Sequence, residues 1–203
     1  MKNLIIAVFF TLFFCGCQHS RPEAISLFNG KDLSGWVIEN NGKFTVENGV
    51  IKVNRGTGWL RSLDKYADFK LIIEFRFMEA KANSGIFVRT GASSKKDKNG
   101  WPDNGYQIQC LDSLKGKIPL GIMIPYGAPP FTFEYNLDAV KKVYKPVEEW
   151  QTYEITAKGE SFTVKLNGTL VTTVKNVKNL DGHIGIQAEH GLLEFRKLDL
   201  LKL

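Results

Sequence analysis

The sequence predicts an all-β domain, built as a β-sandwich or as a barrel. Short runs of alternating or β-branched residues follow one another along the chain, and turn-forming residues separate them at close intervals. Helix signals are nearly absent. The expected strands are residues 36–38, 43–46, 50–53, 59–63, 69–78, 85–90, 106–111, 121–124, 152–157, 162–166, 170–174, 183–187 and 192–200.

Turn chemistry supports the order of these strands. Asn48-Gly49 and Asn167-Gly168 are strong hairpin signals, each between two of the expected strands, and Lys158-Gly159-Glu160 makes a third turn. One helix is expected over Asn136 to Val143, with Asn136 as its cap. It belongs to a long irregular region, Ser113 to Glu149, and loops of this length are usually functional or disordered.

The N-terminus predicts export and lipid attachment. Lys2 precedes an apolar stretch that is too short to span a bilayer, which needs ~20 apolar residues. Gly16-Cys17 resembles the bacterial lipobox, and Cys15 fits it less well. We therefore expect residues 1–16 to be a signal peptide, Cys17 to carry the lipid, 17–25 to form a tether and 26–203 to form one domain. An ordinary signal peptide with incidental cysteines is the alternative.

Composition narrows the location and the partners. The tether has no acidic run, which favours the periplasmic side of the outer membrane in a bacterial cell envelope. The formal net charge is +6, and the basic residues are scattered without the aromatic interleaving that single-stranded nucleic acid needs. We expect no nucleic-acid partner, and membrane contact through the lipid alone. After processing, Cys110 is left without a disulfide partner and is expected to be a small buried hydrophobe.

Polar side chains recur on the non-core side of four expected strands. A strand sends alternate side chains to opposite faces, so the apolar residues of each strand define the core side. Planar amides and guanidiniums offer directed hydrogen bonds of the kind that sugar hydroxyls need. A salt-bridged exposed sheet is the plainer alternative. The polar side chains expected to share this face are Glu74, Arg76, Arg89, Gln107, Gln109, His183 and Gln187.

Other candidates lie in loops and turns. Trp59, Trp101 and Tyr126 could stack against a sugar ring. Histidine side chains commonly transfer protons, which makes His190 a natural proton-transfer candidate, although a loop histidine is more often structural. Glu189 beside it is either its partner or a turn residue. No His, Asp or Glu cluster has metal-ligand spacing, so no metal or other cofactor is expected.

An ordered series of segments resembles the 3-keto-disaccharide hydrolase domain family. The series begins at Leu27 to Trp36 and ends near Arg196, and the resemblance covers essentially all of residues 26–203. It implies a concanavalin A-like jelly-roll β-sandwich of two antiparallel sheets and action on glycosides oxidised at C3 of a sugar ring. The family's polar positions map onto Glu74, Arg76, Asn83, Arg89, Gln109, Gln187 and His190.

Two departures from the family pattern stand out. Many relatives have Glu where this chain has Gln107, so a carboxylate that could accept a proton is missing there. The stretch from Pro129 to Lys145 is also longer than in typical relatives, which affects the expected shape of the site mouth.

The resemblance implies a β-elimination. A C3 ketone acidifies the C2 proton, a base removes it, the C1 oxygen leaves from the enolate, and water can add back. We expect Arg89 or Arg76 at the enolate oxygen and His190 or Glu74 in proton transfer. The residues expected to bind substrate are Arg76, Asn83, Gln107, Gln109, Tyr126 and Gln187. A divalent metal could assist the enolate but is not indicated.

The substrate expected from this chemistry is a small oxidised glycoside, which a partner oxidoreductase would supply. A non-catalytic glycan-binding lipoprotein on the same fold is the rival interpretation, and Gln107 favours it. A structural envelope protein without a sugar role is a third, because fold alone does not fix function.

Overall fold

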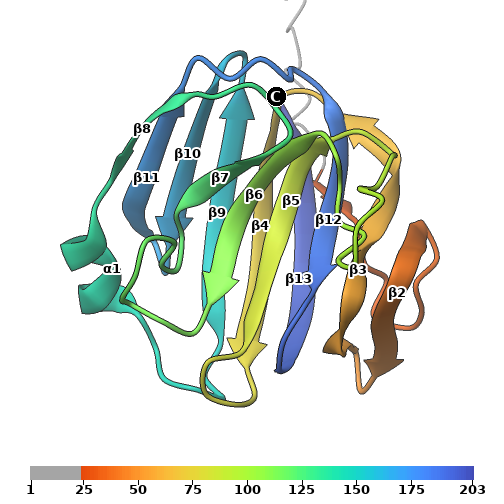
Figure 1. Ribbon diagram of the computed structural model, residues 1–203. Helices are drawn as coiled ribbons and strands as arrows, with labels where there is room; N and C mark the ends of the chain where they lie inside the picture. The colour runs from red at the N-terminus through yellow and green to blue at the C-terminus, as the bar shows by residue number, and fades with distance from the viewer. Residues whose placement is uncertain (1–23) are drawn as a thin grey trace, which may run out of the picture.

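A computed structural model describes residues 24–203, so the expected signal peptide and Cys17 lie outside the described residues (Figure 1). The described chain is almost entirely β-strand, and every strand pair in it is antiparallel. The elements of this part are β1 (Ala24–Ser26), β2 (Trp36–Glu47), β3 (Val50–Tyr66), β4 (Phe69–Phe77), β5 (Asn83–Thr90), β6 (Gly105–Leu111), β7 (Met123–Tyr126), β8 (Thr132–Tyr135), α1 (Leu137–Val143), β9 (Gln151–Lys158), β10 (Ser161–Leu166), β11 (Thr169–Lys175), β12 (Gly182–Ala188) and β13 (Leu192–Lys202).

The strands curl into two layers that β3 joins. One layer, the front sheet, has the order β7-β6-β5-β12 and ends on the 58–66 part of β3. The other, the back sheet, begins at the 51–54 part of β3 and continues β13-β4-β9-β10-β11-β8. Figure 1 shows the front strands lying across the back ones. The all-β sandwich of antiparallel sheets is thus confirmed.

Apolar residues at alternate positions fill the space between the sheets. In β4, Phe69, Leu71, Ile73, Phe75 and Phe77 are fully buried, while the residues between them are partly exposed. This period of two is what a half-buried strand requires. The facing side chains of the front sheet belong to the same cluster; they include Ile86, Val88, Ile108, Cys110, Ile184 and Ile186. Cys110 is therefore a core residue, and burial raises the pKa of its thiol well above the usual value.

The predicted turns and the predicted helix are present. Asn48 and Gly49 both have positive φ, 52° and 77°, and connect β2 to β3, as a two-residue hairpin requires. Asn167 and Gly168 do the same between β10 and β11. At the start of α1, the Asn136 Oδ1 accepts a hydrogen bond from the Ala139 N–H at 2.9 Å.

Four elements differ from the expectation. β1 pairs with β13, although a tether was expected to continue to residue 25. Residues 36–38 and 43–46 form one strand, β2, with an irregularity between Gly42 and Phe44. Residues 50–53 and 59–63 likewise form one long strand, β3, because the chain bends from one sheet into the other without leaving the ladder. In the region 113–149, the edge strand β8 pairs with β11 and was missed.

Within residues 24–203 the longest helix is α1, and none is long and apolar enough to cross a membrane.

Candidate functional site

The outer face of the front sheet carries a row of amide side chains. Ile86, Ile108 and Ile186 point into the core, so their strand neighbours point away from it. Four side chains with terminal amides gather there from three adjacent strands: Asn83 from β5, Gln107 and Gln109 from β6, and Gln187 from β12. We call these four residues the amide cluster. Gln107, Gln109 and Gln187 are all buried.

Two buried polar atoms of the cluster lack a protein partner. The Gln107 Nε2 donates to the Gln187 Oε1 at 2.6 Å. The Gln107 Oε1 and the Gln187 Nε2 are both buried, and no residue in the described part of the chain hydrogen-bonds to either. A buried unsatisfied group costs ~1–3 kcal/mol, and native proteins contain few of them. One acceptor and one donor are thus left without a protein partner, whichever way the two amides are assigned.

Gly85 makes room for this pair. A Cβ built on Gly85 would overlap the Gln107 amide. Any larger residue at this position would therefore displace Gln107 from Gln187.

A second hydrogen-bonded chain leads from the amide cluster to a carboxylate. The Gln109 Nε2 donates to the Asn83 Oδ1 at 3.0 Å, and the Asn83 Nδ2 donates to the Glu189 Oε2 at 2.7 Å. Burial raises the pKa of Glu189, and the hydrogen bond from Asn83 partly opposes this shift. Glu189 is half-buried and follows the last residue of β12 directly.

Aromatic rings border the same face. Tyr126 packs edge-on against Phe87 and Trp101, with ring centroids 5.4 and 5.8 Å away. Burial, with the charge of Glu189 as a smaller cause, raises the pKa of Tyr126 to about 12. Gln187 lies near the Tyr126 hydroxyl and partly offsets this rise in the pKa of Tyr126. The Gln187 Nε2 nevertheless makes no hydrogen bond to the hydroxyl.

The loop that joins β5 to β6 covers part of this face. The Trp59 indole N–H donates to the Ser94 Oγ at 3.1 Å, and the Trp101 indole N–H donates to the Ala188 carbonyl at 3.2 Å. Lys95 lies over the Tyr126 ring, 5.2 Å from its centroid. Trp101 and Tyr126 remain partly exposed, so they can contact a ligand, whereas Trp59 is fully buried.

Glu74 and Arg76 are not part of this arrangement. They lie on β4, in the back sheet, and the expectation that they share a face with the glutamines is wrong. Glu74 pairs with Arg196 at 2.7 Å, and Arg76 pairs with Glu194 at 2.6 Å. The guanidiniums of Arg76 and Arg196 lie over the Trp150 ring, at 4.6 and 3.9 Å from its centroid. These residues form the salt-bridged sheet surface that was the plainer alternative.

Arg89 is also displaced from the expected face. Its φ of 47° breaks the alternation of β5, and an irregularity in the β5–β12 register lies beside it. The fully buried guanidinium lies over Phe162 and donates to the carbonyls of Ala67, Gly159 and Asn179 and to Asp68. Burial lowers its pKa from the usual value. Arg89 holds loops together, and its expected position at the enolate oxygen is wrong.

The histidines occupy different positions. His190 is exposed at the rim of the amide cluster, where its backbone N–H and C=O pair with those of Asn83. His183, expected to point outward, is buried instead, with its Nδ1 2.9 Å from the Ser62 carbonyl oxygen. Burial lowers the pKa of His183.

Of the expected site residues, the structure brings together Asn83, Gln107, Gln109, Tyr126, Gln187 and His190. Glu189 joins them, although the sequence predicts only a turn residue or a partner of His190 at this position. Its position just beyond the outward-facing Gln187 was the available signal. Within residues 24–203, no group of three or more His, Cys, Asp or Glu side chains could hold a metal ion.

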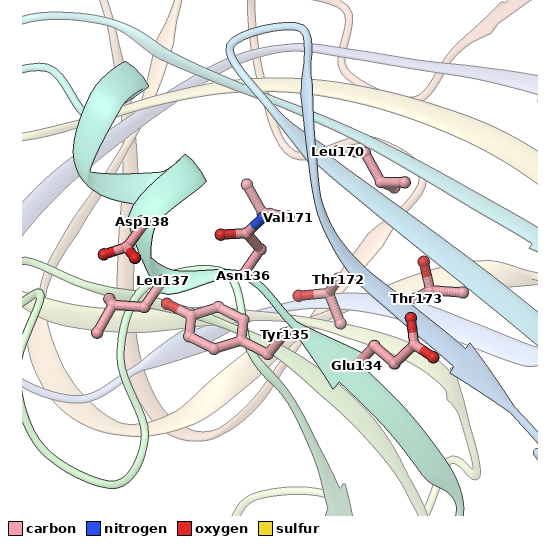
Figure 2. A pocket seen from close by; sticks show the side chains of 9 residues that line it. All are labelled: Glu134, Tyr135, Asn136, Leu137, Asp138, Leu170, Val171, Thr172 and Thr173. Carbon is pink, nitrogen blue, oxygen red and sulfur yellow. The ribbon is translucent and has the colours of Figure 1, made fainter.

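A cavity of about 570 Å³ lies elsewhere, beside β8, β11 and α1 (Figure 2). Three of its polar side chains already make structural contacts. Asn136 caps α1, the Tyr135 hydroxyl donates to the Leu120 carbonyl at 2.9 Å, and the Thr172 hydroxyl donates to the Gly121 carbonyl at 2.7 Å. The buried atoms that need a partner are in the amide cluster, so we place the candidate site there.

Solved structures share this fold at low sequence identity. Two proteins of Parabacteroides distasonis ATCC 8503, each described as a "putative glycosyl hydrolase", are 24% and 18% identical, with TM-scores of 0.68 and 0.65. Each match covers 89% of this chain, and 100% and 94% of the respective relative. The carbohydrate-binding module CBM66 of Bacillus subtilis is 17% identical with a TM-score of 0.55, over 83% of this chain and 96% of that one.

No curated protein matches the sequence. The family of the 3-keto-alpha-glucoside-1,2-lyase-like domain matches residues 23–201, which is nearly the whole described chain. This match confirms the family resemblance found in the sequence and supports a carbohydrate-active role. The chain belongs to the family of the 3-keto-alpha-glucoside-1,2-lyase-like domain.

Proposed function

We propose that the protein cleaves 3-keto-glycosides at the amide cluster, by removal of the C2 proton and β-elimination at C1, with water adding back to complete hydrolysis. The observation that carries this proposal is the buried, unpartnered donor and acceptor of Gln187 and Gln107, beside a carboxylate with a raised pKa. Family membership supports the substrate class.

The two free amide atoms suit adjacent oxygens of an oxidised sugar. The Gln187 N–H can donate to the C3 carbonyl oxygen and strengthen that bond as the oxygen becomes an enolate. The Gln107 carbonyl can accept from a neighbouring hydroxyl. Both side chains are fully buried, so the loop between β5 and β6 that covers part of this face has to move aside before a sugar reaches these atoms. This role replaces the one expected for Arg76 or Arg89.

The remaining steps need groups at the rim. Trp101 and Tyr126 present partly exposed ring surface for the sugar. His190, exposed beside Asn83, can give a proton to the departing C1 oxygen. Elimination leaves a C1=C2 double bond and a C3 ketone, and addition of water across the double bond gives the free 3-keto sugar.

Aglycone release tests the proposal. Purified protein is incubated with α- and β-anomers of a p-nitrophenyl 3-keto-glucoside, and with the unoxidised glucosides as a control. We expect release from at least one oxidised anomer and none from the unoxidised pair. The isosteric Gln187→Glu and the truncated Gln187→Ala should both lower kcat/KM, whereas Glu74→Gln, on the opposite sheet, should not.

Glycan binding without turnover is the second candidate function. Gln107, at a position where many relatives have Glu, favours it, and so does the similarity in fold to a carbohydrate-binding module. Calorimetry separates the two functions. Equal affinity for oxidised and unoxidised sugars, with no aglycone released, would contradict the enzymatic proposal and support binding.

We also propose that the protein is lipid-anchored through Cys17 on the periplasmic side of the outer membrane. The lipobox-like Gly16-Cys17 supports this location. Fractionation of cells expressing the wild-type protein and Cys17→Ala tests it, since only the wild type should be found with the membrane. An oxidoreductase that oxidises the C3 hydroxyl of a glycoside would have to supply the substrate.

A further inference from the structure

We propose that Glu189 is the base that removes the C2 proton, and that Asn83 and Gln109 are positioning residues for its carboxylate. This inference rests on the proposed function above and assigns its proton-transfer step. Neither Glu74 nor His190 holds that role in it.

The geometry fixes one carboxylate oxygen and leaves the other available. The Glu189 Oε2 accepts a hydrogen bond from the Asn83 Nδ2 at 2.7 Å, and the Gln109 Nε2 holds the Asn83 Oδ1 at 3.0 Å. Within residues 24–203 no group hydrogen-bonds to the Glu189 Oε1. A carboxylate held by one oxygen is oriented, and its other oxygen can accept a proton.

Neighbouring residues do not compete for this role. Glu74 lies on the back sheet, paired with Arg196 and Lys197. Gln107 carries an amide, which is too weak a base. Tyr126 retains its proton in the neutral range because its pKa is about 12. His190 is exposed at the rim, better placed to meet a departing group than a buried ring carbon.

The surroundings of Glu189 make it a better base than an exposed carboxylate. Partial burial raises its pKa, and a base is most effective when its pKa approaches the working pH. The ionisable groups near it include Tyr126 and His190, with Lys95 over the Tyr126 ring and Asp97 acting on the same tyrosine. Glu79, paired with Arg55, lies beside Gly191 in the same turn. The hydrogen bond from Asn83 favours the ionised Glu189 carboxylate and partly opposes the rise in its pKa.

The step balances without a further reactant. The Glu189 carboxylate takes the C2 proton, and the C–H electron pair forms the C2=C3 enolate with the charge on O3. The C3 carbonyl then re-forms, a C1=C2 double bond forms, and the C1–O bond breaks. The leaving oxygen takes a proton from the His190 side chain or from Glu189 itself.

Deuterium exchange isolates this step from bond cleavage. A 3-keto-1,5-anhydroglucitol has the C2 proton but no aglycone at C1, so exchange at C2 in D₂O, followed by NMR, reports proton removal without glycosidic cleavage. We expect Glu189→Gln to lower both C2 exchange and aglycone release by roughly 10²–10⁴-fold. Glu160→Gln, a change at a surface carboxylate paired with Lys178, should leave both rates unchanged.

Asn83→Ala tests the positioning role with a readout beyond activity. Removing the hydrogen bond to the ionised form should raise the pKa of Glu189 further. The acid limb of the kcat/KM–pH profile should therefore move to higher pH, and Gln109→Ala should move it less. A structural role alone would lower the rate without moving the limb.

The outcomes distinguish this inference from the proposed function. Calorimetry with the anhydro-ketone first establishes that Glu189→Gln is folded and binds within about threefold of the wild type. If the wild type releases aglycone and folded Glu189→Gln does so at a similar rate, the assignment of Glu189 is wrong and the function stands. If the wild type neither exchanges the C2 proton nor releases aglycone, the assignment of Glu189 and the proposed function are both wrong.

Discussion

Arg89→Met replaces the most deeply buried charge in the described chain by an apolar side chain of similar length. Its guanidinium donates to the carbonyls of Ala67, Gly159 and Asn179. Each of these three hydrogen bonds contributes ~1 kcal/mol of net stability. Asp68 adds little, because its side chain is 36% exposed and water can solvate it. We therefore expect a loss of about 3 kcal/mol in the free energy of unfolding.

Such a loss should be easy to measure. For a domain of this size, each kcal/mol shifts Tm by ~2–4 °C, so Tm should fall by roughly 6–12 °C. Urea unfolding followed by tryptophan fluorescence gives the free energy, and aglycone release at 15 °C gives the activity of the folded fraction. We expect kcat/KM per folded molecule to stay within about threefold of the wild type. Wild-type stability with lost turnover would refute this account and return Arg89 to the active site.

Three other changes probe the two sheets separately. Glu74→Gln should cost less than ~1 kcal/mol of stability, measured by urea unfolding, because its ion pairs lie at the surface, and it should leave kcat/KM unchanged. Gly85→Ala should raise KM for the 3-keto-glycoside by about 3–10-fold, since its methyl group displaces Gln107 from its hydrogen bond. The folded-state pKa of His183 is lowered, so the unfolded chain binds its proton more tightly. Stability should therefore fall as pH drops below the unfolded value near 6.5, and His183→Gln should show a smaller drop between pH 7.5 and 5.5. An unchanged KM in Gly85→Ala, or equal pH dependence in both proteins, would contradict the respective argument.

Much of the fold could be predicted from local patterns. The alternation in β4 identifies its core face without any knowledge of its neighbours. The hairpins at Asn48-Gly49 and Asn167-Gly168 depend on two adjacent residues that tolerate positive φ. Where the prediction was wrong, as in splitting β3 into two strands, the deciding contacts were pairings with β13 and β12 far along the chain.

The site was only half predictable, for a geometric reason. Alternation tells which side chains point away from the core, but a sandwich has two outer faces. Glu74 and Gln107 both point outward and end on opposite sides of the molecule, because β4 and β6 belong to different sheets. Arg89 defeats the rule in another way, since its positive φ reverses the direction of one side chain. No local pattern in the sequence predicts which sheet a strand joins, or that the Arg89 side chain is reversed.

The single strand β3 also determines how the molecule comes apart. Its first part is laddered to β13 and its last part to β12, so neither sheet can detach while β3 keeps its pairs. Amide protons of β3 should accordingly be exchanged only through global unfolding. Trp59, which lies under the site, belongs to this strand. The backbone beneath the ligand-binding face should therefore resist local unfolding as strongly as the core does. Adaptation to a new aglycone would then be confined to substitutions at the rim, around Tyr126 and His190, which leave the pairing of β3 undisturbed.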